Sequence, residues 1–193
     1  MQTTINVKKM TIAAVLCAIG ILIPIISPVK ILLEPASFTL ASHVAIFIAM
    51  FISPVTAVVV SLATTLGFFI YGFPLVVVLR AATHVIWAFV GAYILKKKPN
   101  LIDSLPQMLL FSFLIACLHS ICEMAVVTPF YFSNGMTEGY YAKGYVTSVL
   151  LLVGAGTIVH SMVDFAISLL IWKPLRKTRI FSTPSHRTAV LTK

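Results

Sequence analysis

Charged side chains are scarce in this sequence, and their scarcity sets its class. Only 10% of the 193 residues are charged, whereas a soluble domain carries about a quarter. Hydrophobic residues make up 60% of the chain, and the mean hydropathy is +1.05. These values exclude an ordinary soluble protein and indicate an integral membrane protein. At roughly 20 residues per spanning helix, the chain is long enough for about six spans.

The signatures of several chemistries are also absent. No phosphate-binding loop is present, so the chain cannot drive transport by hydrolysing ATP itself. No H-E-x-x-H motif occurs, and no two intramembrane histidines share a helix at i, i+3 or i+4, so we expect no metal site. No nucleophile stands out beside a histidine, so we expect neither catalytic residues nor a cofactor. The three cysteines fall inside apolar segments without disulfide-framework or C-x-x-C spacing.

The net charge of +9 does not indicate a nucleic-acid partner. Most Lys and Arg residues stand in short segments that flank apolar runs, where they set the orientation of a membrane protein. The two halves of the chain share no obvious motif, which gives little support to an inverted-repeat secondary transporter.

Apolar runs and the breaks between them predict an all-α integral membrane protein. We expect one membrane domain over 1–193, a bundle of six transmembrane helices that ends in a basic cytoplasmic tail, 173–193. The stretch 38–70 could instead form one helix and reduce the count to five. Such a helix would be about 50 Å long, against a hydrocarbon core of about 30 Å, so six spans with both termini cytoplasmic are favoured. The predicted spans cover about 10–27, 38–52, 55–70, 75–95, 107–128 and 145–172.

Three of the hydrophobic segments each carry a polar pair at i, i+4. Residues four apart share a helix face. Ionisable groups at bilayer depth are costly and usually face a bundle interior or a cavity on a substrate or ion pathway. The sequence therefore predicts a polar pocket inside the bundle. The pairs are Arg80 with His84, His119 with Glu123, and His160 with Asp164.

Arg80 needs an anionic partner at this depth. One interpretation is an ion pair with Glu123 or Asp164. The other is a ligand carboxylate, which suits the planar fork of guanidinium donors. His84 and Trp87 continue the same face at i+4 and i+7, and together with Arg80 they could enclose a small carboxylated molecule.

The remaining polar residues allow two interpretations each. His119 and Glu123 fit ligand contact and internal pairing equally well. Helix-to-helix contact is favoured for His160 and Asp164, and also for His43. The segment 28–37 is too apolar for a solvated loop and could close over the outer mouth as a lid. The loop that holds Asn134 could supply the opposite wall, or its tyrosines could anchor the membrane interface.

Specific stretches of the chain resemble a known family. The stretch Pro35–His43, the stretch Phe51–Pro54 and the pattern Ala14-xxx-Ala18 after a basic N-terminus are similar to S components of energy-coupling factor (ECF) vitamin transporters. The similarity is to the pantothenate and niacin branches, and it covers the chain from about Lys8 to Lys177.

The resemblance implies a function, a location and partners. An S component of the bacterial plasma membrane captures a vitamin from outside. It then associates with a membrane T component and two cytoplasmic ATPases, and topples in the membrane to release its cargo. Ala14 and Ala18 correspond to the face that docks on the T component. The implied binding site comprises Ser37, Phe38, Arg80, His84, Trp87, His119, Glu123 and Asn134.

An acidic vitamin would explain Arg80. Pantothenate is favoured, because its hydroxyls and amide would also engage His119, Glu123 and Asn134. Niacin is the alternative, with a ring on which Trp87 could stack. Two other classes stay open: a self-sufficient proton-coupled carrier that uses the His, Glu and Asp pairs as a relay, and a structural scaffold without a ligand.

Overall fold

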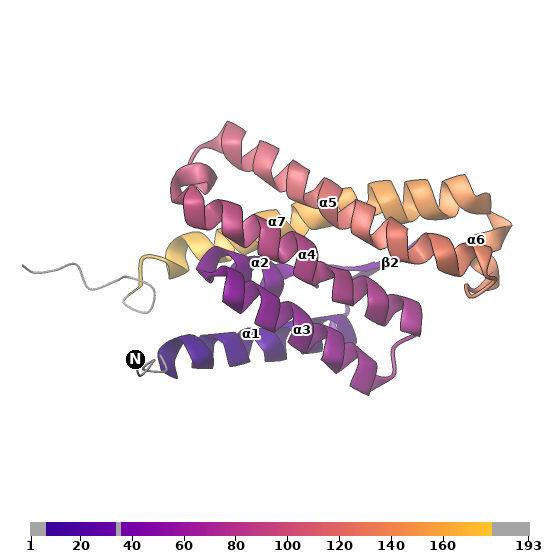
Figure 1. Cartoon of the computed structure of the whole chain (residues 1–193), viewed down its shortest axis with the longest axis horizontal. Coiled ribbons are helices and arrows are strands. Elements are labelled where there is room, and N and C mark those ends of the chain that lie inside the picture. The colour runs from indigo at the N-terminus through magenta and orange to yellow at the C-terminus, as the bar shows by residue number, and fades with distance from the viewer. Residues whose placement is uncertain (1–6, 34–35, 179–193) are drawn as a thin grey trace, which may run out of the picture.

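The chain folds as a bundle of long helices around one short helix and a β-hairpin (Figure 1). The computed structural model describes residues 7–33 and 36–178, without the side chains of residues 30–33, 36 and 37. Within these ranges, five helices are long and apolar enough to cross a membrane. They are α1 (Val7–Ile26), α3 (Pro54–Tyr71), α4 (Leu75–Lys97), α5 (Leu105–Phe132) and the continuous helix formed by η2 (Val146–Ala155) and α7 (Gly156–Leu175).

The second predicted span, 38–52, takes a different form. Strands β1 (Lys30–Leu33) and β2 (Ala36–Thr39) pair antiparallel, with Ile31 opposite Phe38. A turn follows, and α2 (Val44–Ile52) has only nine residues, about 14 Å at 1.5 Å per residue. This is about half of a hydrocarbon core. The prediction missed the turn because a residue far along the chain, Asp164, fixes its backbone.

Helix α2 lies at the centre of the bundle. Its residues from Val44 to Met50 are all buried, and it contacts α1, α3, α4 and α7. A helix that is apolar on every side needs such an enclosed position. It ends at Ser53, where the backbone is extended and the side-chain Oγ accepts a hydrogen bond from Thr56 N at 3.1 Å. Pro54 then opens α3 from its first turn, where proline is tolerated.

Basic residues gather at one end of the bundle, on the left in Figure 1. The start of α1, the end of α4 and the end of α7 meet there. Lys9, Lys96 and Arg176 line one cavity of about 610 Å³ at this end. The short 3₁₀ helix η1 (Pro99–Ile102) closes the same end, and Arg176 Nη2 donates to Asp103 Oδ1 at 2.6 Å.

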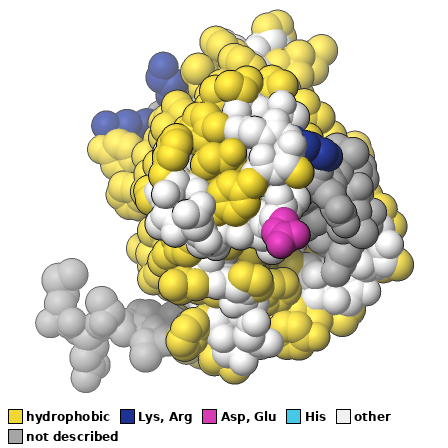
Figure 2. Space-filling model, turned by 90° about the vertical axis from the view of Figure 1, so that its right-hand side faces the viewer, with side chains coloured by type: hydrophobic (Ala, Val, Ile, Leu, Met, Phe, Trp, Pro, Cys, Tyr) yellow, Lys and Arg dark blue, Asp and Glu magenta, His cyan; other side chains and the backbone are white. Residues whose placement is uncertain are grey.

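The outer surface of the bundle is largely hydrophobic. Figure 2 looks onto the end at the right of Figure 1, where apolar side chains are mixed with uncharged polar groups and backbone and few charged side chains are seen. Val55, Leu66 and Leu170 each expose more than half of their surface. Soluble monomers rarely expose large contiguous apolar patches, so this surface is suited to contact with lipid.

Candidate ligand-binding site

A cavity of about 170 Å³ lies where the hairpin and the start of α2 meet the long helices. Pockets for drug-sized molecules run to about 300–1,000 Å³, so this one suits a small ligand. One wall is apolar and largely aromatic, and the other carries charged and imidazole groups. The apolar wall includes Phe38, Ile46, Phe68, Phe73 and Val77. The polar wall includes Ser42, His43, Arg80, His84, Glu123 and His160.

Arg80 and Glu123 form an ion pair in the polar wall. Arg80 Nη2 donates to Glu123 Oε2 at 2.7 Å, and Thr157 Oγ1 donates to the same oxygen at 2.8 Å. Internal pairing, one of the two predicted roles of Arg80, is therefore present. Arg80 also lines the cavity. Its Nε is buried and finds no hydrogen-bond partner among the described residues.

The second oxygen of Glu123 faces two histidines. Glu123 Oε1 lies 3.6 Å from His84 Nε2 and 3.4 Å from His119 Nε2. Neither contact has the geometry of a hydrogen bond, and both Nε2 atoms lack a partner within the described part of the chain. One buried carboxylate therefore connects α4, α5 and α7.

Asp164 fixes the turn that leads into α2. Its Oδ1 accepts from Ala41 N at 2.8 Å, and its Oδ2 accepts from His43 N at 2.9 Å. Ala41 has a φ of 66°, in the left-handed region that is uncommon for residues other than glycine. At membrane depth, irregular backbone is tolerated only where it is buried in protein or lines a cavity. The turn meets this condition because Ser42 and His43 line the cavity. Asp164 accepts the hydrogen bonds of two of its backbone N–H groups.

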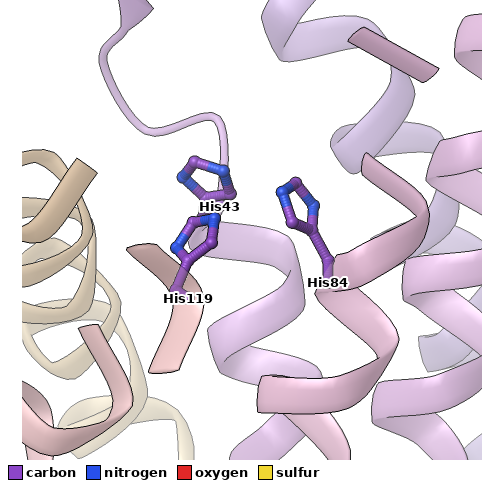
Figure 3. Close-up of side chains that lie close together, drawn as sticks. All are labelled: His43, His84 and His119. Carbon is purple, nitrogen blue, oxygen red and sulfur yellow. The ribbon is translucent and has the colours of Figure 1, made fainter. Parts of the chain in front are cut away.

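His43 stands at the start of α2, among imidazoles from three other helices. Its ring centroid lies 4.8 Å from that of His84, 4.8 Å from that of His119 and 5.0 Å from that of His160. Figure 3 shows the rings of His43, His84 and His119 converging from three separate elements. His43 Nδ1 lies 3.1 Å from Asp164 Oδ2, and Ser42 Oγ lies 3.0 Å from His160 Nε2.

The structure brings four of the eight predicted binding residues to the cavity: Phe38, Arg80, His84 and Glu123. His119 lies behind them and is fully buried. Trp87 does not line the cavity, because its ring is enclosed by Phe47 and His119, each with a centroid 4.9 Å away.

Two other predicted residues lie apart from this group. Asn134 is exposed in the turn between α5 and α6 (Glu138–Ala142), with a φ of 57°. Ser37 belongs to β2, opposite Leu32, and its side chain lies outside the described residues. The two alanines of the predicted docking face, Ala14 and Ala18, are exposed on α1.

Sequence reasoning underestimated two histidines that line the cavity. Contact between helices was favoured for His43 and His160, and both make such contacts, with Asp164 and with Ser42 respectively; both also line the same cavity as Arg80. The i, i+4 spacing of His160 and Asp164 was the available signal. It identified a polar face without showing that this face meets the turn before α2.

Comparison with known proteins identifies a relative over most of the chain. No family model matches the sequence, and no solved structure matches it. The niacin transporter NiaX of Lactococcus lactis subsp. cremoris (strain MG1363) is 43% identical over 165 residues. The match covers 85% of this chain and 72% of the relative.

Proposed function

The chain belongs to the S components of ECF vitamin transporters, multi-pass proteins of the cell membrane, and we propose that it captures niacin in the cavity beside Arg80. The observation that carries the proposal is the 43% identity with a niacin transporter over most of the chain. This likeness corrects the preference for pantothenate, which it does not support. The alternative vitamin, niacin, fits better.

The chemistry of the cavity supports this choice of ligand. Niacin is a single aromatic ring with one carboxylate, whereas pantothenate is a longer, branched and more flexible acid. A cavity of about 170 Å³ favours the smaller molecule. Phe38, Phe68 and Phe73 give the ring an aromatic wall, and Arg80 with His43 and His84 faces the carboxylate from the other side.

Arg80 can serve a ligand and Glu123 at the same time. A guanidinium has five N–H donors in a fixed fork, and Glu123 is bonded to Nη2. The donors that remain are suited to a second carboxylate. In this proposal Glu123 holds the guanidinium in place and the vitamin completes its coordination.

The broken second segment supports six membrane crossings. Helix α2 covers about half of the bilayer core, and the hairpin with its turn covers the outer half. The basic end of the bundle would then be cytoplasmic, as the positive-inside rule expects. Both termini would lie on that side.

Transport would require partner subunits. We infer that a membrane T component docks on the exposed face of α1 that carries Ala14 and Ala18, since small residues allow close helix approach. Two cytoplasmic ATPases would supply the energy. Niacin would enter from the exterior, and the change of access would come with docking.

Co-purification tests the whole proposal. Protein isolated in mild detergent from niacin-grown cells should carry niacin detectable by mass spectrometry, together with a T component and ATPases. Reconstituted alone in liposomes it should not accumulate niacin. Proton-driven uptake by the isolated chain would establish a self-sufficient carrier instead, and a chain that binds neither vitamin nor partners would be a scaffold.

A further inference from the structure

The three imidazoles in Figure 3 form a group that the vitamin alone does not explain. His43, His84 and His119 each offer a ring nitrogen, and these three atoms lie within 4.8 Å of one another. They come from the start of α2, from α4 and from α5. His119 is fully buried and His84 is 5% exposed. The sequence predicted no metal site because it was searched for two histidines on one helix, whereas these three histidines lie on three elements.

The Nδ1 atoms of His43 and His119 have the hydrogen-bond partners that are common in metal sites. A carboxylate only accepts hydrogen bonds, so His43 Nδ1, 3.1 Å from Asp164 Oδ2, carries a hydrogen. His119 Nδ1 lies 3.3 Å from Ser161 Oγ. Metal-binding histidines commonly donate their second ring N–H to a carboxylate or another acceptor, and the contact with Asp164 fixes the tautomer of His43. His43 Nε2 is then available to coordinate, and His119 Nε2 is available when its Nδ1–H donates to Ser161 Oγ.

Three ring nitrogens of this group have no hydrogen-bond partner among the described residues. His119 Nε2 and both ring nitrogens of His84 are buried without a hydrogen-bond partner there. A buried polar atom without a partner costs about 1–3 kcal/mol, and such atoms are rare in native structures. Of these atoms, His84 Nε2 and His119 Nε2 lie beside the same carboxylate oxygen, Glu123 Oε1, and this arrangement indicates a group that binds between them.

We propose that His43, His84 and His119 bind a transition metal ion of the Zn²⁺ class at the base of the cavity. Imidazole nitrogens suit zinc, copper, iron and nickel, and do not suit magnesium or calcium. Around a tetrahedral Zn²⁺ with bonds of about 2.0–2.1 Å, the nitrogens stand about 3.3 Å apart, so the rings draw in slightly. Glu123 Oε1, beside two of the three nitrogens, takes the fourth position.

The ion would also change the sign of the net charge at the site. This part of the inference rests on the proposed function. Among the described side chains around the cavity, Arg80 pairs with the buried carboxylate of Glu123, and a second buried carboxylate, Asp164, lies against His43. With neutral imidazoles, the group carries one net negative charge and repels an acid. A divalent cation makes the charge positive by one unit. The site then attracts a carboxylate.

Metal content tests the inference directly. The full chain would be purified with a tag that contains no histidine, incubated with Zn²⁺, desalted and measured by plasma mass spectrometry. We expect one Zn²⁺ per chain, a loss in His84→Gln and His119→Gln, and no loss in the matched control His160→Gln. Absence of zinc in the unmutated chain would overturn the inference. So would retention in His84→Gln, or a loss in His160→Gln alone, which would assign the ion to His43, His160 and Asp164.

A spectroscopic measurement on the unmutated chain tests the site even if the variants fail to fold. Co²⁺ in a tetrahedral site of three nitrogens and one oxygen gives visible d–d bands. The unmutated chain should show them on titration with Co²⁺ and lose them when Zn²⁺ is added. A chain that gives no bands contradicts the assignment.

Niacin titration separates this inference from the proposed function. Metal-free protein should bind niacin about tenfold or more weakly than zinc-loaded protein, the ratio that about 1.4 kcal/mol gives. Equal affinity in both forms would overturn the role of the ion while leaving the proposed function intact. Zinc binding without niacin binding in either form would leave the metal site and overturn the function.

Discussion

At the scale of single residues, the proposed binding of niacin depends on Arg80 and the planar fork of its guanidinium. Arg80→Lys keeps the positive charge but loses the geometry that serves Glu123 and a second carboxylate together. Hydrogen bonds to charged groups contribute about 1.5–3 kcal/mol, so niacin affinity should fall roughly 10- to 150-fold. Isothermal titration measures the change.

The matched control for this substitution is Arg176→Lys. Arg176 also pairs with a carboxylate, Asp103, but it lies at the basic end, away from the cavity. Its replacement should leave the affinity unchanged. Equal affinities for the unmutated chain and Arg80→Lys would show that the ligand does not use the fork.

Asp164 should matter for stability more than any surface acid. Asp164→Ala leaves the N–H groups of Ala41 and His43 without their acceptor. Each buried donor left in this way costs about 1–3 kcal/mol, so the free energy of unfolding should fall by about 2–6 kcal/mol. Thermal unfolding in detergent reports the loss. The exposed ion pair of Asp103 contributes about 0–1 kcal/mol. A drop in Asp103→Ala as large as the drop in Asp164→Ala would contradict this assignment.

Single residues also show how far the sequence could predict the site. Pairing of Arg80 with a carboxylate could be foreseen, because an arginine at bilayer depth needs an anion. The position of Trp87 could not, since its place at i+7 from Arg80 does not specify the rotation of α4 against its neighbours. Phe47 and His119 enclose its ring instead. The convergence of His43 with His84 and His119 depends on three such rotations.

At the scale of elements, the second membrane segment shows the limit of hydropathy. Residues 38–52 are apolar enough to be predicted as a helix, and the break at Ser53–Pro54 follows from proline alone. The change from β2 to α2 depends on the contact with Asp164, more than a hundred residues away in sequence. Local pattern cannot carry that information. The deviation produces the cavity, because a continuous helix would fill the space.

At this scale, the exposed face of α1 can be tested by a substitution at Ala14. Ala14→Trp adds a large ring to the exposed face that we assign to the T component. Niacin binding should stay intact while niacin uptake by cells fails, because close helix approach is blocked. Titration and an uptake assay measure the two effects.

A lipid-facing position provides the control for Ala14. Leu114 is 56% exposed on α5, so Leu114→Trp should leave both binding and uptake near their normal levels. Normal uptake by Ala14→Trp would mean that the partner docks elsewhere. A loss of binding in Ala14→Trp would mean that the substitution distorts the bundle.

At the scale of the whole molecule, composition and charge distribution carried much of the class, and the resemblance of specific stretches to a known family carried the family. Few charges, long apolar runs and the stretches around Pro35–His43 pointed to a membrane S component, and the 43% identity with NiaX bears this out. The vitamin was harder to predict. In our proposal Arg80 would select acids as a group, whereas the choice between two acids depends on the shape of a cavity built from seven elements.

The most direct test is titration of the purified, zinc-loaded chain with niacin, its amide and pantothenate. We predict saturable binding of one niacin per chain, much weaker binding of the amide, which brings no carboxylate to Arg80, and no binding of pantothenate. Binding of pantothenate without niacin, or equal binding of niacin and its amide, would contradict a small site built to receive an aromatic acid.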